Sequence, residues 1–265
     1  MKKVLLADSH AHLMDSRLLD KSKEIVDHME ADCLAFIVEI GTGIQESKKA
    51  LAFASNHNNV YCTLGVHPHY ASEYTQEFEA FAKQSMPNSK IIAIGECGLD
   101  YHYDNSPRPV QREVFVAQIK LAYRLGLPMV IHSRDAFQDT LDIMKEHKKL
   151  LVNGVLLHCF GYGAEEARQL LAEFDCCFAF GGAITFPGKK MCQTTLQEAL
   201  DVVPLNRVIL ETDCPYLAPV PMRGKTNEPK NVKFIAEFIA KQLGKSFAEV
   251  AEATLENTKR FFRIS

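Results

Sequence analysis

Short apolar runs that end in a histidine or an acidic residue recur along this chain and constrain its fold more than any other feature. The clearest runs occupy residues 4–12, 91–96, 129–132, 155–158 and 208–213. They end in His12, Glu96, His132, His158 and Asp213, all residue types that bind metal ions. Ligands carried singly by separate strands converge only if the strands lie side by side with their carboxyl ends together, as in a parallel barrel. The pattern predicts a metal-dependent hydrolase.

The number of strand-like runs predicts the α/β class and a single TIM-like (β/α)8 barrel. Such runs begin near residues 4, 33, 60, 91, 129, 155, 177 and 208, and helical patterns separate them. The length of 265 residues agrees with the roughly 250 that such a barrel needs. No linker or low-complexity stretch divides the chain, so residues 1–265 are predicted to form one domain. The irregular parts are residues 185–191 and 215–229, which follow late strands.

Two helices carry clear signals in the sequence. One should end at Gly126 and bury a single apolar face. That predicted face consists of Val110, Val114, Ala117, Leu121 and Leu125. Ser246 and Glu249 form a capping-box pattern, which predicts a last helix that runs to about Phe262.

Composition excludes several classes of protein. The net charge of -3 gives no general positive field for nucleic acid, so a nucleic-acid substrate would be held locally, by metal and a few cations. Eight cysteines without a Cys-x-x-Cys pair indicate reduced thiols in a cytoplasmic protein. The first apolar stretch is too short for a signal peptide, and no run approaches the roughly 18 apolar residues of a membrane span. We therefore expect no membrane association.

His10 and His12 lie two residues apart, so both side chains share one face of a regular strand and can bind one cation. Alone, this pair is weak evidence, because either histidine could be a hydrogen-bonded core residue. For His132 or His158 taken singly, a buried histidine that bonds to a backbone carbonyl is the commoner explanation. Asp8 shares the face one step deeper, where it is predicted to orient one of the imidazoles.

Glu96 ends its apolar strand, and its two carboxylate oxygens could bridge two metal ions. We expect Gly95 and Gly98, which flank it, to leave the approach to the carboxylate open. For an isolated glutamate, a salt-bridged carboxylate with glycines for turn geometry would be the default. The register of Glu96 with four other such strand ends favours metal binding.

Asp213 and Glu211 share one face at the end of the last strand. We favour Asp213 as the residue that binds metal and orients or deprotonates the attacking water, with Glu211 in a structural or supporting role. Capping of the next helix is the alternative role of Asp213, because Pro215 follows closely.

Taken together, these segments resemble the TatD family of metal-dependent hydrolases, within the amidohydrolase-like barrels. The matching segments cover essentially the whole chain in family order. They are DSHAHL at Asp8, GVHPH at Gly65, GECGLDY at Gly95, PMVIHSRDA at Pro128, LHCF at Leu157, GGAITF at Gly181, ETDCPYLAPVPMRGKTNEP at Glu211 and ENTKRFF at Glu256. The resemblance implies a TIM-like barrel that uses one or two divalent ions, Mg²⁺, Mn²⁺ or Zn²⁺, to cleave phosphodiesters, with deoxyribonuclease activity as the usual description.

The resemblance also implies roles for individual residues. One metal would be bound by His10, His12, Glu96 and Asp213, and the other by Glu96, His132 and His158. In the implied two-metal hydrolysis, Glu96 and Asp213 would be the central catalytic residues.

His67 corresponds to a family position near the substrate, where it would stabilise the phosphate as a catalytic and substrate-binding residue. Arg223 and Lys225 fall where phosphate contacts are plausible, although both could instead brace their loop.

Departures from the family pattern are few. Cys97, Cys159 and Cys214 each follow a predicted ligand, and His102 and Tyr103 replace a more usual aromatic and acidic stretch. Strand alternation predicts that the three cysteines face the helix layer, away from the ions. Thiolates that faced the ions would shift the preference toward zinc.

Two other functions stay open at this point. A small-molecule amidohydrolase could use the same metals on an amide, ester or lactone, although related barrels often bridge their ions with a carbamylated lysine and the fourth strand here ends without one. A non-catalytic barrel that binds metal for stability is the second alternative. For a nuclease, the lack of a basic patch or stacking platform in the sequence favours a single-stranded or frayed DNA end over long duplex. No protein partner is inferred.

Overall fold

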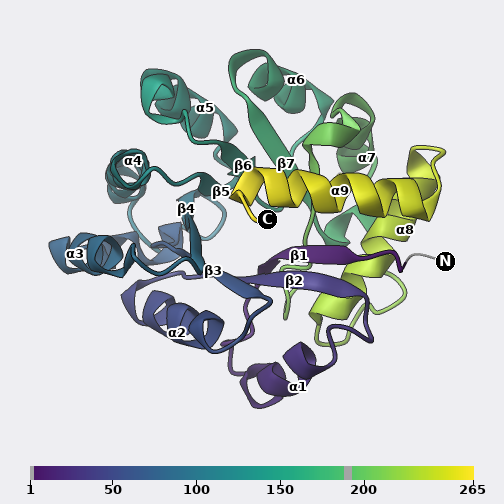
Figure 1. The fold of residues 1–265 in the computed structure, drawn as a ribbon. Coiled ribbons are helices and arrows are strands. Elements are labelled where there is room, and N and C mark those ends of the chain that lie inside the picture. Colours follow the sequence, from purple (N-terminus) through teal and green to yellow (C-terminus); the bar gives the residue numbers. More distant parts are fainter. Residues whose placement is uncertain (1–2, 188–192) are drawn as a thin grey trace.

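The computed structural model describes residues 3–187 and 193–265. Within these residues, eight parallel strands in the order β1 to β8 alternate with helices and curve into a barrel (Figure 1). The strands are β1 (Leu6–Ala11), β2 (Leu34–Glu39), β3 (Val60–Leu64), β4 (Ile91–Asp100), β5 (Met129–Arg134), β6 (Val155–Leu157), β7 (Cys176–Phe180) and β8 (Val208–Leu210). The helices are α1 (Ser22–Asp27), α2 (Ile44–Ser55), α3 (Gln76–Ser85), α4 (Arg108–Leu125), α5 (Phe137–Glu146), α6 (Ala164–Glu173), α7 (Gln193–Val202), α8 (Val232–Gln242) and α9 (Phe247–Phe262). The predicted barrel is therefore confirmed.

The barrel closes between β1 and the residues that follow β8. Ala11 bridges to Cys214, and the backbone N–H of His12 donates to the carbonyl of Cys214 at 2.8 Å. The N–H of Asp213 donates to the carbonyl of His10 at 2.9 Å. These bonds bring Asp213, from near the end of the chain, beside the two histidines near its start.

Helix α9 lies across one end of the barrel (Figure 1). Side chains at the end of α9 enter the interior of the barrel from this side. Phe261 and Phe262 of α9 pack with inward-facing side chains such as Val130, Leu156 and Ile209. Burial of a phenylalanine side chain contributes about 1.5–3 kcal/mol. Asn257 of α9 donates to the carbonyls of Leu205 and Val208, before and at the start of β8, and Arg263, directly after α9, donates to the carbonyl of Gly126, before β5. Helix α9 therefore closes the amino-terminal end and leaves the carboxyl-terminal end for function.

The capping box is confirmed, because the Ser246 side chain accepts from Glu249 N and the Glu249 side chain accepts from Ser246 N. Helix α4 ends at Gly126 in the left-handed conformation, also as predicted. Its predicted buried face is only partly right: Val114 and Leu121 are buried. The buried residues of α4 are Gln111, Val114, Phe115, Gln118, Ile119, Leu121 and Ala122.

Buried glutamines account for this rotated face of α4. Gln118 accepts a hydrogen bond from Val66 N (2.8 Å) and donates one to Val66 O (2.9 Å), directly after β3. Gln111 in the same way accepts from Asp100 N and donates to Asp100 O at the end of β4. Apolar periodicity cannot reveal a buried polar residue that holds a loop, so the interior face was misplaced.

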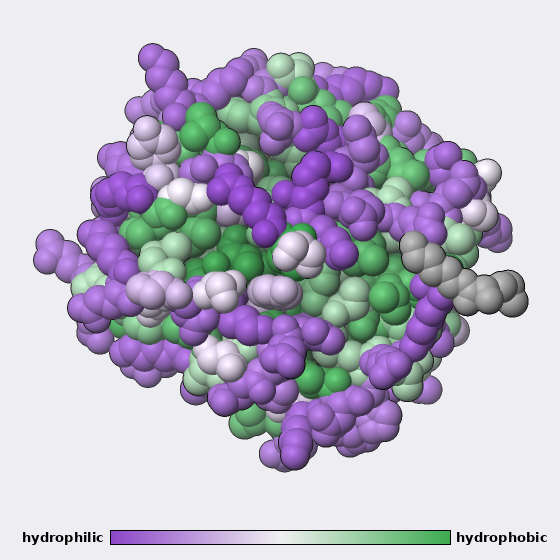
Figure 2. Space-filling model, in the orientation of Figure 1, coloured by the Kyte–Doolittle hydropathy of each residue, from purple (hydrophilic) through white to green (hydrophobic). Residues whose placement is uncertain are grey.

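Figure 2 views the molecule from the α9 side and shows hydrophilic residues spread over most of this face, with apolar residues between them. In the described part of the chain, none of the helices combines the length and apolar character needed to cross a membrane.

Candidate metal centre

Glu96, the sixth of the ten residues of β4, lies at the centre of a cluster of imidazoles. The prediction that its strand ends at Glu96 was wrong, because β4 continues to Asp100. Its Oε2 is 3.3 Å from His10 Nε2, and its Oε1 is 2.8 Å from His132 Nδ1. Oε1 is also 3.4 Å from His67 Nε2 and 3.4 Å from His158 Nε2. Burial by itself would raise the pKa of Glu96, but the surrounding imidazoles hold that pKa well below its usual value. The two oxygens of this carboxylate therefore face different sets of nitrogen atoms.

His10, His12 and Asp213 occupy the Oε2 side of Glu96. Asp213 Oδ1 lies 3.4 Å from His12 Nε2 and 3.8 Å from His10 Nε2. Burial would raise the pKa of Asp213, but the bond with His12 and the nearby imidazoles lower it, so it is ionised at neutral pH. Closure of the barrel sets this arrangement, because Asp213 is tied to the backbone of His10.

His158 follows β6 and is oriented by Glu211, which follows β8. His158 Nδ1 is 2.9 Å from Glu211 Oε2, and the other carboxylate oxygen accepts from Cys159 N at 2.7 Å. With Nδ1 occupied by a carboxylate, the second nitrogen of the ring points at Glu96. Glu211 thus has the supporting position that the sequence suggested.

His132, on β5, is oriented in the opposite sense by Asp100, a residue that sequence reasoning did not single out. His132 Nε2 is 3.0 Å from Asp100 Oδ2, which leaves Nδ1 facing Glu96. Asp100 Oδ2 also lies 3.2 Å from His69 Nε2. The signal was present, because Asp100 ends the long β4 strand inside the GECGLDY segment.

His67 differs from the other histidines in the partner of its second nitrogen. His67 Nδ1 accepts a hydrogen bond from the backbone N–H of His69 at 3.1 Å. In the neutral ring, the proton is therefore on Nε2, which points at Glu96. Burial lowers the pKa of His67 to about 4, so the ring is neutral near pH 7. His67 is accordingly placed to donate a hydrogen bond rather than to bind a metal through this nitrogen.

The residues around Glu96 fit divalent metal ions. Both ring nitrogens of the wholly buried His10 lack a hydrogen-bond partner within residues 3–187 and 193–265. A buried polar atom without a partner costs about 1–3 kcal/mol, which a bound cation would remove. Imidazole and carboxylate donors suit divalent metals. Groups that could hold one include His10 with His12 and Glu96, His10 with His158 and Asp213, and His132 with Glu96 and His67.

A cavity of about 580 Å³ opens above these residues at the carboxyl ends of the strands. It is lined by the predicted ligands His12, Glu96, His132, His158 and Asp213, and by His67. The rim of this cavity includes polar and aromatic residues of the loops after β1, β3, β4 and β8. A substrate can therefore reach the candidate metal centre.

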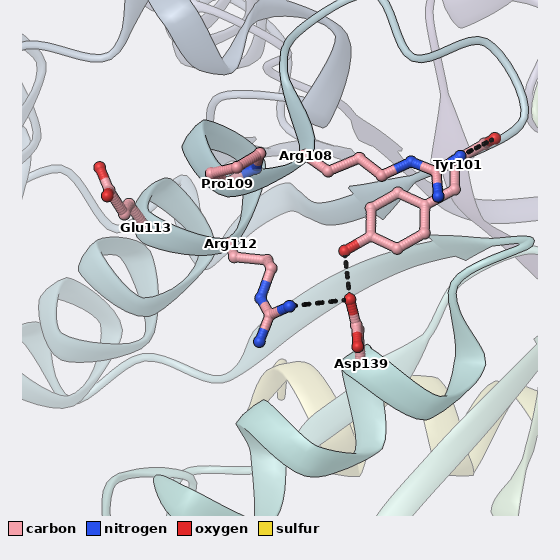
Figure 3. A pocket seen from close by; sticks show the side chains of 6 residues that line it. All are labelled: Tyr101, Arg108, Pro109, Arg112, Glu113 and Asp139. Carbon is pink, nitrogen blue, oxygen red and sulfur yellow. Dashed lines mark hydrogen bonds and ion pairs between the residues drawn. The ribbon is translucent and has the colours of Figure 1, made fainter.

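A smaller pocket of about 370 Å³ lies outside the barrel mouth, between α4 and α5 (Figure 3). The Tyr101 hydroxyl donates to Asp139 at 2.6 Å, and Arg112 donates to the same carboxylate at 3.2 Å. Arg108 is paired with Asp104. The cations here already have acidic partners, and no histidine lines the pocket, so it is not the candidate reaction site.

The family model of the TatD-related DNases matches residues 7–263. The chain belongs to this family. It is 39% identical over 261 residues to the uncharacterized metal-dependent hydrolase YabD of Bacillus subtilis (strain 168), covering 98% of this chain and 100% of that protein. It is 34% identical over 251 residues to the 3'-5' ssDNA/RNA exonuclease TatD of Erwinia tasmaniensis, covering 92% of this chain and 94% of that protein.

A solved structure supports the fold of this TatD-family chain. The crystal structure of YjjV, a TatD homolog from Escherichia coli K12, matches it with a TM-score of 0.89 over 98% of each chain. At 24% identity, this likeness bears on the fold alone. The family model and the relative from Bacillus subtilis confirm the family expected from the sequence, and with it the expectation of a metal-dependent hydrolase.

The glycines beside Glu96 have a different role from the one predicted. A Cβ atom on Gly95 would lie 2.5 Å from the carbonyl oxygen of Val130 and 2.8 Å from its Cβ, and one on Gly98 would overlap the carbonyl of His132. Both glycines therefore allow β4 to approach β5 closely. The explanation of these glycines from the sequence, an open approach to the carboxylate, was wrong.

Asp8 was also assigned the wrong partner. Its carboxylate accepts from Thr212 N at 2.8 Å and from the Thr212 hydroxyl at 2.5 Å, and it contacts the backbone rather than the ring of His10. Asp8 therefore holds the segment after β8 in place beside β1. The error arose because strand alternation predicts the face of a side chain but not its partner on the neighbouring strand.

Two of the three cysteines beside the ligands lie where strand alternation predicts. Cys97 and Cys214 are buried in the core between strands and helices. Cys159 differs, because its sulfur lies within 4.8 Å of ligand atoms of His158 and Glu211. Cys159 has φ 42°, so the extended conformation has ended there and alternation no longer applies.

Arg223 and Lys225 are not among the residues that line the cavity. The Arg223 guanidinium lies 3.7 Å from the centre of the Phe186 ring, a contact that braces its loop. Their phosphate contacts stay a prediction. Of the irregular segment at residues 185–191, residues 188–191 lie outside the described residues.

Proposed function

We propose that this TatD-family chain is a divalent-metal-dependent phosphodiesterase that removes nucleotides from single-stranded or frayed nucleic-acid ends. The observation that carries the proposal is Glu96, whose two oxygens face separate sets of metal-binding side chains. The relative from Erwinia tasmaniensis named as a 3'-5' ssDNA/RNA exonuclease supports this class of substrate. DNA is the substrate predicted from the sequence, and RNA is added on the strength of this relative.

The residues would share the work as follows. His10, His12 and Asp213 would hold one divalent ion and His132 and His158 a second, with Glu96 between them. Such ions generate a nucleophile near neutral pH and neutralise charge on the phosphate.

The remaining chemistry falls to side chains that face the cavity. Asp213 is ionised and partly exposed there, so it can orient the attacking water and accept its proton. His67 presents its Nε2–H, which can donate to a phosphate oxygen.

Digestion of an end-labelled single-stranded DNA oligonucleotide tests this function. Metal-stripped protein is reloaded separately with Mg²⁺, Mn²⁺ or Zn²⁺, and labels at the 5' and 3' ends give the direction of attack. We expect a metal-dependent ladder that Glu96→Gln abolishes, while Glu113→Gln, an exposed carboxylate outside the cavity, serves as the matched control. Near-wild-type cleavage by Glu96→Gln would remove Glu96 from the scheme.

The same experiment separates the proposal from its alternatives. Turnover of an amide, ester or lactone panel without phosphodiester cleavage would instead indicate a small-molecule amidohydrolase. Absence of any turnover, together with unfolding on chelation, would indicate a barrel that binds metal only for stability.

A further inference from the structure

Three exposed tyrosines stand around the mouth of the candidate metal centre. Tyr70, Tyr103 and Tyr216 line the cavity and are 47%, 56% and 47% exposed. Among the described residues, the remaining exposed tyrosine is Tyr123, on the outer surface of α4 and away from the cavity. Large exposed rings therefore concentrate at the opening. They come from loops that follow β3, β4 and β8. Because these loops are far apart in the sequence, no sequence pattern indicated that the three rings line one cavity.

Each of these rings is in edge contact with a histidine of the site. The ring centres of Tyr216 and His12 are 6.1 Å apart, and those of Tyr70 and His67 are 6.5 Å apart. The Tyr103 ring lies 5.4 Å from that of His69. Tyr216 thus stands next to the candidate ligand His12, whereas Tyr70 and Tyr103 stand next to His67 and His69 at the side of the candidate metal centre, where groups next to a bound phosphate would lie.

Arg134 supplies a positive charge beside one of these rings. Its guanidinium lies 4.9 Å from the centre of the Tyr103 ring, and it forms no ion pair with another described residue. Arg17, beside Tyr216, is different because Asp15 accepts two hydrogen bonds from its guanidinium. Of these two arginines, Arg134 alone keeps its charge available to a phosphate.

We propose that Tyr70, Tyr103 and Tyr216 form a stacking platform for the unpaired bases of a nucleic-acid end, with Arg134 on the adjacent phosphate. This inference rests on the proposed function and adds the residues that select a single strand. Every base offers a π-face, whereas in a duplex that face is covered by neighbouring bases. An arginine that stacks on a tyrosine also leaves its N–H groups free to bind phosphate.

Binding of two matched oligonucleotides tests the platform. The probes are a fluorescein-labelled 12-nucleotide thymidine oligomer and the same oligomer with base-free tetrahydrofuran residues at its last three 3' positions. Affinity is measured by anisotropy with Mg²⁺ in an Asp213→Asn background, which prevents cleavage. We expect Tyr103→Ala to weaken binding of the complete oligomer by about 5- to 100-fold and to leave binding of the base-free one nearly unchanged. Tyr103→Phe should retain affinity, because the ring remains.

Two further variants sharpen the result. Tyr123→Ala, an equally exposed tyrosine outside the cavity, should bind both oligomers as the unsubstituted background does. Arg134→Gln should weaken both oligomers alike and reduce the slope of log affinity against log salt by about 0.7, the signature of one phosphate contact on a single strand.

The outcomes separate this inference from the proposed function. If the wild-type protein cleaves nucleic acid but Tyr103→Ala matches Tyr123→Ala on both oligomers, the platform is wrong and the nuclease stands. If the wild-type protein neither binds nor cleaves nucleic acid with any of the three ions, both proposals fail.

Discussion

Replacement of Gly95 by alanine should damage the metal centre without touching a ligand. Gly95 precedes Glu96, has φ 150°, and packs its Cα against β5. An added Cβ would lie 2.5 Å from the carbonyl oxygen of Val130 and 2.8 Å from its Cβ. Carbon atoms pack at about 3.5–4.0 Å, so β4 and β5 would have to separate by roughly 1 Å.

The expected cost of Gly95→Ala has two parts. A residue with a Cβ at this positive φ costs about 1–3 kcal/mol, and an added carbon in a packed interior costs about 1–3 kcal/mol. The sum of about 2–6 kcal/mol is a large part of the roughly 5–15 kcal/mol by which a domain is stable. A 1 Å displacement of Glu96 relative to His132, now 2.8 Å away, also exceeds the tolerance of about 0.2 Å of a metal site. Misplacement of this size lowers catalytic efficiency by about a hundredfold.

Gly126→Ala is the matched control for this prediction. Gly126 also has a positive φ, 70°, but an added Cβ would meet nothing within 4 Å. It should cost only the strain of the left-handed conformation, about 1–2 kcal/mol. Urea unfolding of the metal-free proteins and chelator competition for Mn²⁺ measure both effects. The reasoning is refuted if Gly95→Ala equals Gly126→Ala in stability and in metal affinity.

Three other predictions follow from the same contacts. Asp100→Asn should weaken metal binding about 10- to 100-fold. The amide N–H₂ of asparagine would donate to His132 Nε2 and so favour the tautomer whose proton is on Nδ1, the nitrogen that faces the metal site. Unchanged affinity in chelator competition would count against this role of Asp100. Burial raises the pKa of Asp8 from 3.8 to about 8. Between pH 4 and 8 the Asp8 side chain is therefore neutral in the folded protein but ionised in the unfolded one. Its contribution to the free energy of unfolding falls as the pH rises through this range. The free energy of unfolding of Asp8→Asn should therefore rise relative to that of the wild type by about 1.4 kcal/mol per pH unit between pH 4 and 8. Urea unfolding of the metal-free proteins measures this difference. Parallel plots of unfolding free energy against pH for the two proteins would contradict a neutral Asp8 in the folded state. Finally, a divalent ion at a hundred times its dissociation constant should add about 2.7 kcal/mol to the free energy of unfolding, and a melting temperature unchanged by metal would exclude binding to the folded state.

The barrel could be predicted from the sequence because its signals are local and repeated. Each buried strand is a short apolar run, and the observed strands begin within two residues of the predicted positions, for example at Leu6, Leu34 and Cys176. The face of α4 could not be predicted, since Gln111 and Gln118 are buried through hydrogen bonds to loops that are distant in sequence. A scale of hydrophobicity records the residue type but not its partner.

The candidate ligands could be predicted for a related reason, since alternation along a strand fixes the face on which each side chain lies. Their partners could not, because each partner comes from a neighbouring strand whose register the sequence does not reveal. Asp100 was missed although it ends β4, because only the register of β4 against β5 brings it to His132. The register of β8 likewise decides that Asp8 meets Thr212 rather than an imidazole.

The second nitrogens of His132, His158 and His67 explain how similar rings take different roles in one cavity. Asp100 and Glu211 are acceptors, so His132 and His158 direct protons at them and turn the other nitrogen toward Glu96. His67 is bonded on its second nitrogen by a backbone donor, so its proton is directed into the cavity. We infer that the first arrangement creates metal ligands and the second creates a hydrogen-bond donor for the phosphate. The role of each of these histidines thus follows from the chemistry of its hydrogen-bond partner rather than from the residue type. For this reason the sequence pattern of histidines could locate the site but could not separate metal ligands from hydrogen-bond donors.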